Sequence, residues 1–197
     1  MQFIYLPNII SITRLFLVPV IIWLIVTNKL FGAFLVFLVA GLTDALDGFL
    51  ARRFGWRTEL GAYLDPVADK ALLVSVYAAL GFFGHIPAWL VILVISRDLL
   101  IIGAVMLSWL LGRTGSIHPL LISKVNTVLQ ISLAVLVLAE GGAHIGWGGY
   151  ITPLTWATGL TTGLSAAVYL VIWLRRMARY DLDERLKQAG RDAGRGQ

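Results

Sequence analysis

Six apolar stretches, separated by short polar or glycine-containing connections, make up most of the chain. An α-helix needs roughly 20 residues to cross the roughly 30 Å hydrocarbon core of a bilayer, and each stretch is about that long. The pattern predicts six transmembrane helices, near residues 9–26, 31–50, 63–83, 88–111, 125–139 with a slight extension each way, and 151–174. We expect residues 1–174 to form one membrane domain and residues 175–197 a basic tail that begins amphipathic and ends Gly-rich and frayed.

Composition supports this assignment and narrows the chemistry. The chain has 197 residues, of which 58% are hydrophobic and 14% charged, and its mean hydropathy is +0.83, well above that of soluble domains. The predicted fold class is therefore an all-α integral membrane protein with six transmembrane helices. There is no cysteine, which excludes disulfides, thiolate nucleophiles and cysteine-bound metals. Any metal must be held by oxygen or imidazole ligands.

Basic residues are distributed unevenly between the two sides of the predicted bundle. They crowd the second connection, flank the fourth and fill the tail, whereas the connections on the other side contain only Lys29. The positive-inside rule then places both termini in the cytoplasm. The net charge of +5 indicates attraction to anionic lipids, with no nucleic-acid partner expected. No targeting extension precedes Pro7, which favours a multi-pass protein of the bacterial cell (inner) membrane over a mitochondrial one.

Two carboxylates, Asp44 and Asp47, stand at the end of the second apolar stretch. On a helix with about 100° per residue, they share one stripe with Gly48 and Ala51. Because these two small residues have almost no side chain, a bulky polar ligand could approach the backbone closely at this point.

A second pair of carboxylates, Asp65 and Asp69, follows Gly61 at the start of the third stretch with a spacing of four. This spacing stacks the three residues on one helical face. Pro66 suits the first position of a helix and predicts a helix start with Asp65 as its N-cap. In either case Asp65 and Asp69 stay about one turn apart.

Four carboxylates close to a membrane need compensation, because a charged side chain at the bilayer centre costs at least about 2.5–3.5 kcal/mol. Arg52 and Lys70 are too few to supply it. Two divalent cations, Mg²⁺ or Mn²⁺, held by carboxylate oxygens would neutralise the site and suit phosphoryl chemistry. The alternative is that the acids only cap helix ends and pair with arginines of the second connection.

The complete spacing is Asp44-x2-Asp47-Gly48-x2-Ala51-Arg52-x8-Gly61-x3-Asp65-x3-Asp69. It resembles the signature of the CDP-alcohol phosphotransferases, with every fixed position filled. The resemblance implies six transmembrane helices and two divalent metals that help transfer a phosphatidyl or similar group from a CDP-linked donor to an alcohol, releasing CMP. We therefore expect an active site that faces the cytoplasm.

The resemblance also assigns roles to individual residues. Asp69 would complete the metal cluster and, as the catalytic residue, take the proton of the acceptor hydroxyl. The implied metal ligands are Asp44, Asp47, Asp65 and Asp69. The implied CDP-binding residues are Asn8, Asp44, Gly48, Ala51, Arg52, Gly61 and Asp65.

The opening segment "PNIISITRLFLVPV" resembles the branch of the family that makes phosphatidylglycerophosphate and cardiolipin, and the segments "ISRDLLIIGAV" and "ISKVNTVLQI" resemble the CMP-forming cardiolipin synthases within it. This implies CDP-diacylglycerol as donor and phosphatidylglycerol as acceptor, with glycerol 3-phosphate, the acceptor of phosphatidylglycerophosphate synthases, as the alternative. Since arginine suits phosphate binding, we expect an acceptor pocket formed by Arg14, Arg97, Asp98, Lys124 and Asn126. Arg97 and Asp98 could instead form a buried pair, and Lys124 could be an interfacial anchor.

A function of a different class is also open. Intramembrane carboxylates mark ion paths as readily as active sites, so the chain could be a cation transporter. The clustering of the four signature acids near one side of the membrane, with small residues between them, favours the enzyme. The sequence leaves a homodimeric assembly open.

Overall fold

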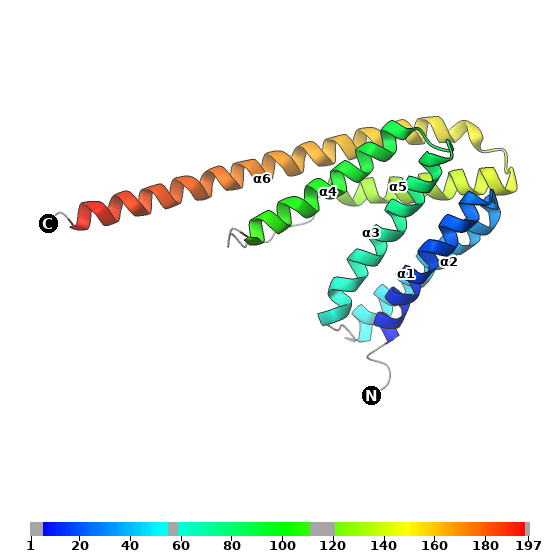
Figure 1. Ribbon diagram of the computed structural model, residues 1–197, viewed down its shortest axis with the longest axis horizontal. Helices are drawn as coiled ribbons and strands as arrows, with labels where there is room; N and C mark the ends of the chain where they lie inside the picture. Colours follow the sequence, from blue (N-terminus) through cyan, green and yellow to red (C-terminus); the bar gives the residue numbers. More distant parts are fainter. Residues whose placement is uncertain (1–5, 55–58, 111–120, 196–197) are drawn as a thin grey trace.

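The computed structural model of the chain describes residues 6–54, 59–110 and 121–195. Within these ranges it leaves out the side chains of 6–11, 45–54, 59–67, 69, 105, 108–110, 176 and 179–195. The described backbone is all helical (Figure 1). Its elements are α1 (Leu6–Val26), α2 (Leu30–Phe54), α3 (Glu59–Phe82), α4 (Ala88–Leu110), α5 (Leu121–Ala143), the short 3₁₀ helix η2 (Gly148–Tyr150) and α6 (Ile151–Arg195).

The six long helices coincide with the six apolar stretches, but two boundaries differ from the prediction. Helix α3 begins at Glu59, so Pro66 lies inside the helix and Asp65 is not its N-cap. A proline inside a membrane helix is tolerated because neighbouring groups can satisfy the backbone carbonyl that it frees. Helix α6 continues without interruption to Arg195, where a frayed end was expected, because the tail is rich in the strong helix formers Ala, Leu, Glu, Lys, Arg and Gln.

The helices are joined at one end of the molecule by tight connections. After α1, Asn28 adopts a left-handed conformation with φ 56°, and the N–H of Lys29 donates to the carbonyl of Leu24 at 2.8 Å. After α3, Gly84 has φ 76°, and the N–H of His85 donates to the carbonyl of Leu80 at 2.8 Å. Positive φ is cheap for glycine and tolerable for asparagine, so the chain reverses within a few residues at both places.

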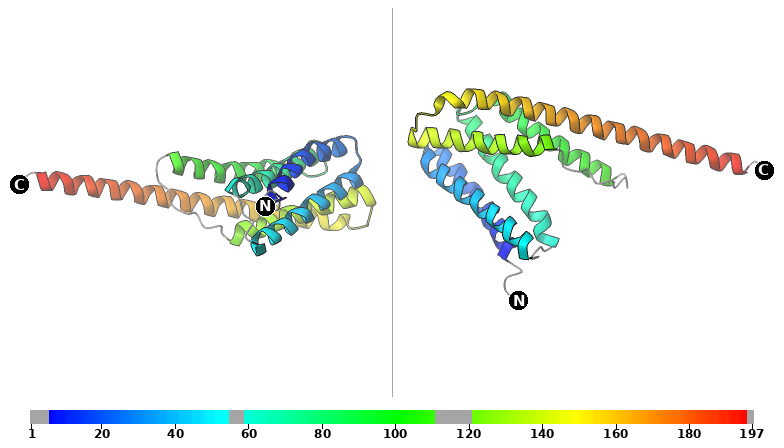
Figure 2. Two further views of the ribbon diagram at one scale, coloured as in Figure 1. Left: turned by 90° about the horizontal axis from the view of Figure 1, so that it is seen from below. Right: turned by 180° about the vertical axis from the view of Figure 1, so that it is seen from behind.

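The helices form two groups that meet at this end and diverge toward the other (Figures 1 and 2). In the first group, α1 packs against both α2 and α3; in the second, α6 packs against α4 and α5. Contacts of α2 with α5 and of α3 with α4 join the two groups. The joint is filled by a cluster of buried apolar side chains that includes Ile21, Ile25, Tyr77, Leu80, Leu90, Leu133 and Leu138.

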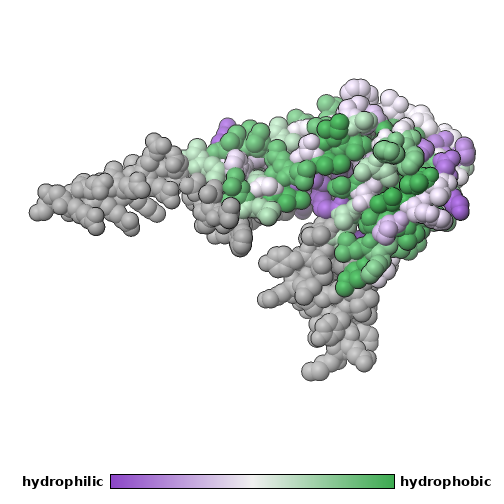
Figure 3. All heavy atoms as spheres, viewed as in Figure 1, coloured by the Kyte–Doolittle hydropathy of each residue, from purple (hydrophilic) through white to green (hydrophobic). Residues whose placement is uncertain are grey.

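On the face shown in Figure 3, the described residues present a largely apolar surface. Large side chains such as Phe16 and Phe82 are exposed by 71% and 84%, respectively. Contiguous exposed apolar surface of this kind marks an interaction site for lipid or protein. Among the described residues, two helical stretches, Leu121–Ala143 and Gly148–Arg175, are long and apolar enough to cross a membrane, and shorter apolar helical segments occupy Ile12–Val26, Leu30–Asp44 and Lys70–Phe82.

Candidate active site

A pocket of about 420 Å³ opens between α1, α2, α3 and α5. Its ionic side chains are Arg14, Asp44 and Lys70, one from each of three helices. The other lining residues are mostly apolar: Phe37, Leu38, Ala40, Gly41, Leu42, Leu72, Leu73, Thr127, Ile131 and Val135. The pocket therefore combines three ionic side chains with a mostly apolar lining, an arrangement that fits an amphiphile.

Two predicted site residues, Arg14 and Asp44, meet in this pocket. The Arg14 guanidinium on α1 donates from Nη2 to Oδ1 of Asp44 on α2. Arg14 is only 3% exposed, whereas the side chain of Asp44 is 37% exposed. A buried arginine is stable here because its hydrogen bond to a carboxylate is charge-assisted. The pair fixes α1 against α2 where the signature begins.

The rest of the signature lies on the two helices that share this pocket. Asp47 follows Asp44 by one turn on α2, and Asp65 and Asp69 are one turn apart on α3, directly before Lys70. The implied CDP-binding residues lie on the same segments, except for Asn8 on the first turns of α1. Apart from Asp44, the side chains predicted for metal and CDP binding lie outside those that the structure describes: Asn8, Asp47, Gly48, Ala51, Arg52, Gly61, Asp65 and Asp69.

Arg97 on α4 is 3% exposed and engages all its nitrogen atoms within the protein. Nη1 donates to Asp98 Oδ1 at 2.6 Å, and Nε and Nη2 donate to Ser165 Oγ on α6 at 3.2 and 3.0 Å. Nη2 also donates to Ser123 Oγ on α5. The guanidinium lies 5.9 Å from the centre of the Tyr169 ring. Arg97 therefore ties three helices together, as in the buried-pair alternative, and its role in acceptor binding stays a prediction.

Lys70 is a residue that the sequence analysis did not place in the site. Its Nζ donates to Oδ1 of Asp98 at 2.6 Å, so one carboxylate oxygen accepts from both Lys70 and Arg97. The Lys70 side chain is 37% exposed and also lines the pocket. The available signal was its position directly after the last signature acid, together with the presence of an acid, Asp98, within the fourth apolar stretch.

The two predicted acceptor residues on α5 lie apart from the lining of this pocket. Lys124 is exposed, and Asn126 is fully buried against α6. Asn126 Oδ1 accepts hydrogen bonds from Thr161 Oγ1 at 3.0 Å and from Thr162 Oγ1 at 2.7 Å. In this arrangement Asn126 joins two helices, and the binding of an acceptor by either residue stays a prediction.

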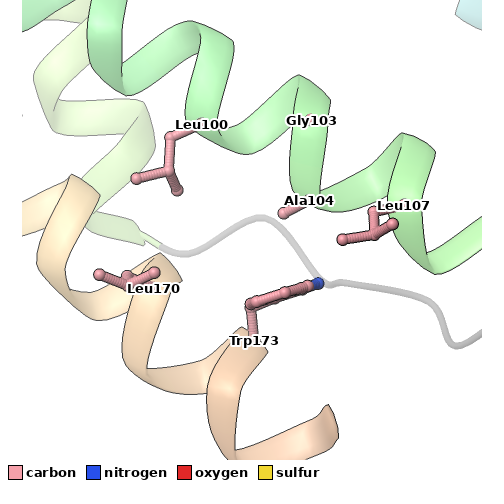
Figure 4. Close-up of a pocket in the computed structure, with 6 residues that line it drawn as sticks. All are labelled: Leu100, Gly103, Ala104, Leu107, Leu170 and Trp173. Atoms are coloured by element: carbon pink, nitrogen blue, oxygen red, sulfur yellow. The ribbon is translucent and has the colours of Figure 1, made fainter.

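A second, smaller pocket of about 130 Å³ lies between α4 and α6 (Figure 4). Apolar side chains from the two helices face each other across it, and no charged side chain lines it. Its lining consists of Leu100, Gly103, Ala104, Leu107, Leu170 and Trp173. It is too apolar for the chemistry that the signature predicts, which points to the larger pocket as the site.

Comparison with known proteins identifies the family. The profile of the CDP-alcohol phosphatidyltransferases matches residues 4–177, which is most of the chain. The chain belongs to this family. The resemblance inferred from the signature is therefore confirmed, and the chain is a member of a family of membrane-bound transferases.

Several curated relatives of this CDP-alcohol phosphatidyltransferase bear one of two names. A chloroplastic CDP-diacylglycerol–glycerol-3-phosphate 3-phosphatidyltransferase of Oryza sativa is 39% identical over 85% of the chain and 56% of its own length. Cardiolipin synthase (CMP-forming) of Homo sapiens is 37% identical over 83% of the chain and 60% of its own length. The synthase of the same name from Streptomyces coelicolor is 32% identical over 90% of the chain and 86% of its own length. The chain thus spans less than two thirds of the length of the first two relatives.

The donor atoms of the site fit the divalent metals that CDP-alcohol phosphatidyltransferases generally use. The four signature acids offer only carboxylate oxygens, the ligands that Mg²⁺ and Mn²⁺ prefer. Asp44, the one whose side chain is described, is partly exposed at the pocket and keeps Oδ2 available beside its pair with Arg14. Among the described side chains no three acids or histidines gather, so the predicted metal cluster would also need Asp47, Asp65 and Asp69 and stays a prediction.

Proposed function

We propose that this chain transfers a phosphatidyl group from CDP-diacylglycerol to phosphatidylglycerol, which yields cardiolipin and CMP. The observation that carries the proposal is the amphipathic pocket, which is lined by Asp44 of the signature, two cationic side chains and mostly apolar residues. A lipid-linked phosphate fits such a pocket better than a free metal ion or a sugar does. The human and Streptomyces relatives named cardiolipin synthase (CMP-forming) support the choice.

In the proposed reaction, the acceptor hydroxyl oxygen forms a bond to the phosphatidyl phosphorus, and the bond from that phosphorus to CMP breaks. The Asp69 carboxylate takes the hydroxyl proton. Asp44, Asp47, Asp65 and Asp69 would hold two Mg²⁺ or Mn²⁺ ions. These ions, when bound, neutralise the diphosphate and stabilise the leaving CMP. Arg14 holds the Asp44 carboxylate in place through its hydrogen bond.

The residues proposed for the nucleotide lie next to the metal ligands. Gly48, Ala51 and Gly61 leave room for the cytidine, Arg52 stands near the diphosphate, and Asn8 contributes from α1. For the acceptor, Arg14 lines the pocket directly. The remaining proposed acceptor residues, Arg97, Asp98, Lys124 and Asn126, lie on α4 and α5.

A second candidate acceptor is glycerol 3-phosphate, which would make the product phosphatidylglycerophosphate. It is favoured by the rice relative, whose name specifies that acceptor and whose identity to the chain, 39%, is as high as that of the cardiolipin synthases. Both acceptors carry a phosphate, so the cationic side chains of the pocket suit either.

We further propose the membrane arrangement that such a reaction requires. Helices α1 to α6 would each cross the bilayer, with both termini and the active site on the cytoplasmic side. The distribution of basic residues supports this orientation. The protein would lie in the inner membrane of a bacterial cell, and relatives from Streptomyces and Mycobacterium support this location. A homodimer is the proposed assembly.

The test is a lipid-transfer assay on the purified protein. CDP-diacylglycerol is supplied with either phosphatidylglycerol or glycerol 3-phosphate in the presence of Mg²⁺ or Mn²⁺, and CMP and the lipid products are resolved by mass. Cardiolipin from the first acceptor supports the proposal, whereas turnover with glycerol 3-phosphate alone establishes the second candidate. A cation transporter would release no CMP with either acceptor.

Variants of one signature acid connect the activity to the pocket. Asp44→Asn should abolish CMP release, since an amide is a poor ligand for Mg²⁺ and a weaker partner for Arg14. Asp183→Asn in the C-terminal part of α6 is the matched control, because it makes the same chemical change far along the chain from the signature. Near-normal turnover of folded Asp44→Asn would remove Asp44 from the site.

A further inference from the structure

The Lys70 side chain both lines the pocket and forms an ion pair with an acid on another helix. It lines the pocket with Arg14 and Asp44, and its Nζ donates to buried Asp98 on α4 at 2.6 Å. An ammonium has three N–H donors, and the structure shows one of them in use on Asp98. With 37% of its side chain exposed, Lys70 can offer its other donors to a molecule in the pocket.

Asp98 determines where the Lys70 ammonium lies. The carboxylate is 4% exposed, and its Oδ1 also accepts from Arg97 Nη1 at 2.6 Å. Arg97 is in turn fixed by Ser123 on α5 and Ser165 on α6. The position of Asp98 is therefore set by three helices, and Lys70 is the one cation of this network that lines the pocket among the described residues.

The charges of the pocket point to the kind of group that Lys70 meets. Among the described side chains that line it, two are cations and one is an anion, and the anion is already paired with Arg14. The apolar wall next to them suits acyl chains. A phosphate linked to a lipid provides both an anionic group and an apolar part.

The geometry points to Lys70 as the residue that binds a phosphate group of a lipid-linked substrate, with Asp98 as the positioning residue that holds its ammonium at the pocket. This inference rests on the proposed function and names a contact within the same site. The phosphate can come from the diphosphate of the donor or from the phosphodiester of the acceptor. The KM values for donor and acceptor, measured separately, distinguish these two sources.

The network allows Lys70 to be changed without leaving an unpaired buried acid. In Lys70→Met, Asp98 keeps its hydrogen bond to Arg97, so the cost of an isolated buried carboxylate is avoided. Methionine also fills the space of the lysine stem with an unbranched apolar chain. Lys70→Gln, which keeps a polar end, is the second variant if Lys70→Met does not purify as a folded protein.

The experiment measures steady-state CMP release in mixed micelles while donor and acceptor are varied separately by surface mole fraction. The proteins are wild type, Lys70→Met, Lys70→Arg and Asp98→Asn, and the control is Lys29→Met, which changes an exposed lysine in the connection between α1 and α2. Thermal unfolding of each protein checks its fold. Direct binding of a non-reacting CDP-lipid analogue to each protein gives a readout that does not depend on turnover.

The expected result is a rise in KM of about ten- to hundredfold for one substrate in Lys70→Met, the range that a hydrogen bond to a charged group supplies. The value of kcat should change far less, and Lys70→Arg should restore most of the affinity. Asp98→Asn should raise the same KM by a smaller factor. A higher KM for the donor, together with weaker binding of the analogue, assigns the phosphate to CDP-diacylglycerol. A higher KM for the acceptor alone assigns it to the acceptor.

Two results would overturn the inference. One is a loss confined to kcat with both KM values unchanged, which would mean that Lys70 acts only through the helix that carries Asp69. The other is a Lys70→Met protein that behaves like Lys29→Met. The failure of the proposed function itself looks different, because the wild-type protein would then release no CMP with phosphatidylglycerol as acceptor.

Discussion

Gly142, near the end of α5, lies close to the backbone of the first turn of α2, and replacing it with alanine should separate the two helices. A Cβ atom built there would stand 2.3 Å from the backbone nitrogen of Phe31 and 2.5 Å from its Cα, whereas ordinary contact begins at 3.4 Å. The backbones would therefore have to move apart by 3.4 − 2.3 = 1.1 Å. A gap of about 0.5–1 Å already forfeits a quarter to a half of the dispersion energy of the atoms that face it.

The net effect of Gly142→Ala follows from two opposing contributions. Overpacking in a tight interface costs about 1–3 kcal/mol, and the better helix propensity of alanine returns up to about 1 kcal/mol. We therefore expect a net destabilisation of about 1.5 kcal/mol, within a range of about 0–3 kcal/mol. Since α2 and α5 both line the pocket, CMP release should fall as well.

The assay is thermal unfolding in detergent, followed by tryptophan fluorescence, for which the chain has seven reporters. Gly163→Ala on α6 is the matched control, because a Cβ atom there would have no neighbour within 4 Å. This control should gain about 0.5–1 kcal/mol from helix propensity alone. The reasoning is refuted if Gly142→Ala is as stable as Gly163→Ala or more so, since the close contact would then carry no cost.

Three further predictions concern the core, the charged pair and the metals. Tyr77→Phe loses the hydrogen bond of 3.0 Å to the carbonyl of Gln130. The free energy of unfolding should therefore fall by about 0.5–1.5 kcal/mol, while CMP release per folded protein stays unchanged. Arg14→Met should reduce CMP release more than Arg14→Lys does, because only lysine keeps a charged partner for Asp44; equal turnover of both would speak against this pair. Chelation with EDTA should stop CMP release and added Mg²⁺ or Mn²⁺ should restore it, so turnover that persists in excess chelator would contradict the metal site.

The number and approximate places of the helices could be predicted from the sequence because apolar length is a strong signal in a membrane chain. Local exceptions were harder to foresee. Pro66 is the kind of residue that starts a helix, yet α3 begins at Glu59, since tertiary packing can retain a proline that an isolated helix would not. At the end of α6 the sequence predicted a frayed segment, but the chain is helical there. Its charged, strongly helix-forming residues continue the helix to Arg195 despite two late glycines.

The candidate site was predictable where residues follow one another along a helix and less so where they meet across helices. The signature spacing placed Asp44 and the three other acids on two neighbouring segments. The pairing of Lys70 with Asp98 joins residues 28 positions apart and depends on how α3 meets α4, which hydrophobic periodicity does not specify. The same holds for Arg14 and Asp44, which the sequence assigned to different subsites and the fold brings into one hydrogen bond.

The arrangement of charge and apolar wall bears on which alcohol attacks. Phosphatidylglycerol and glycerol 3-phosphate both present an anion to the cationic side chains, so Arg14 and Lys70 cannot by themselves distinguish them. Of the two acceptors only phosphatidylglycerol carries acyl chains, which only an apolar surface can recognise. Leu73 of α3 and Ile131 of α5 face the same pocket as those cations. A preference for the lipid acceptor should therefore depend on the shape of this wall, and the cations should mainly set the affinity for the phosphate that the two acceptors share.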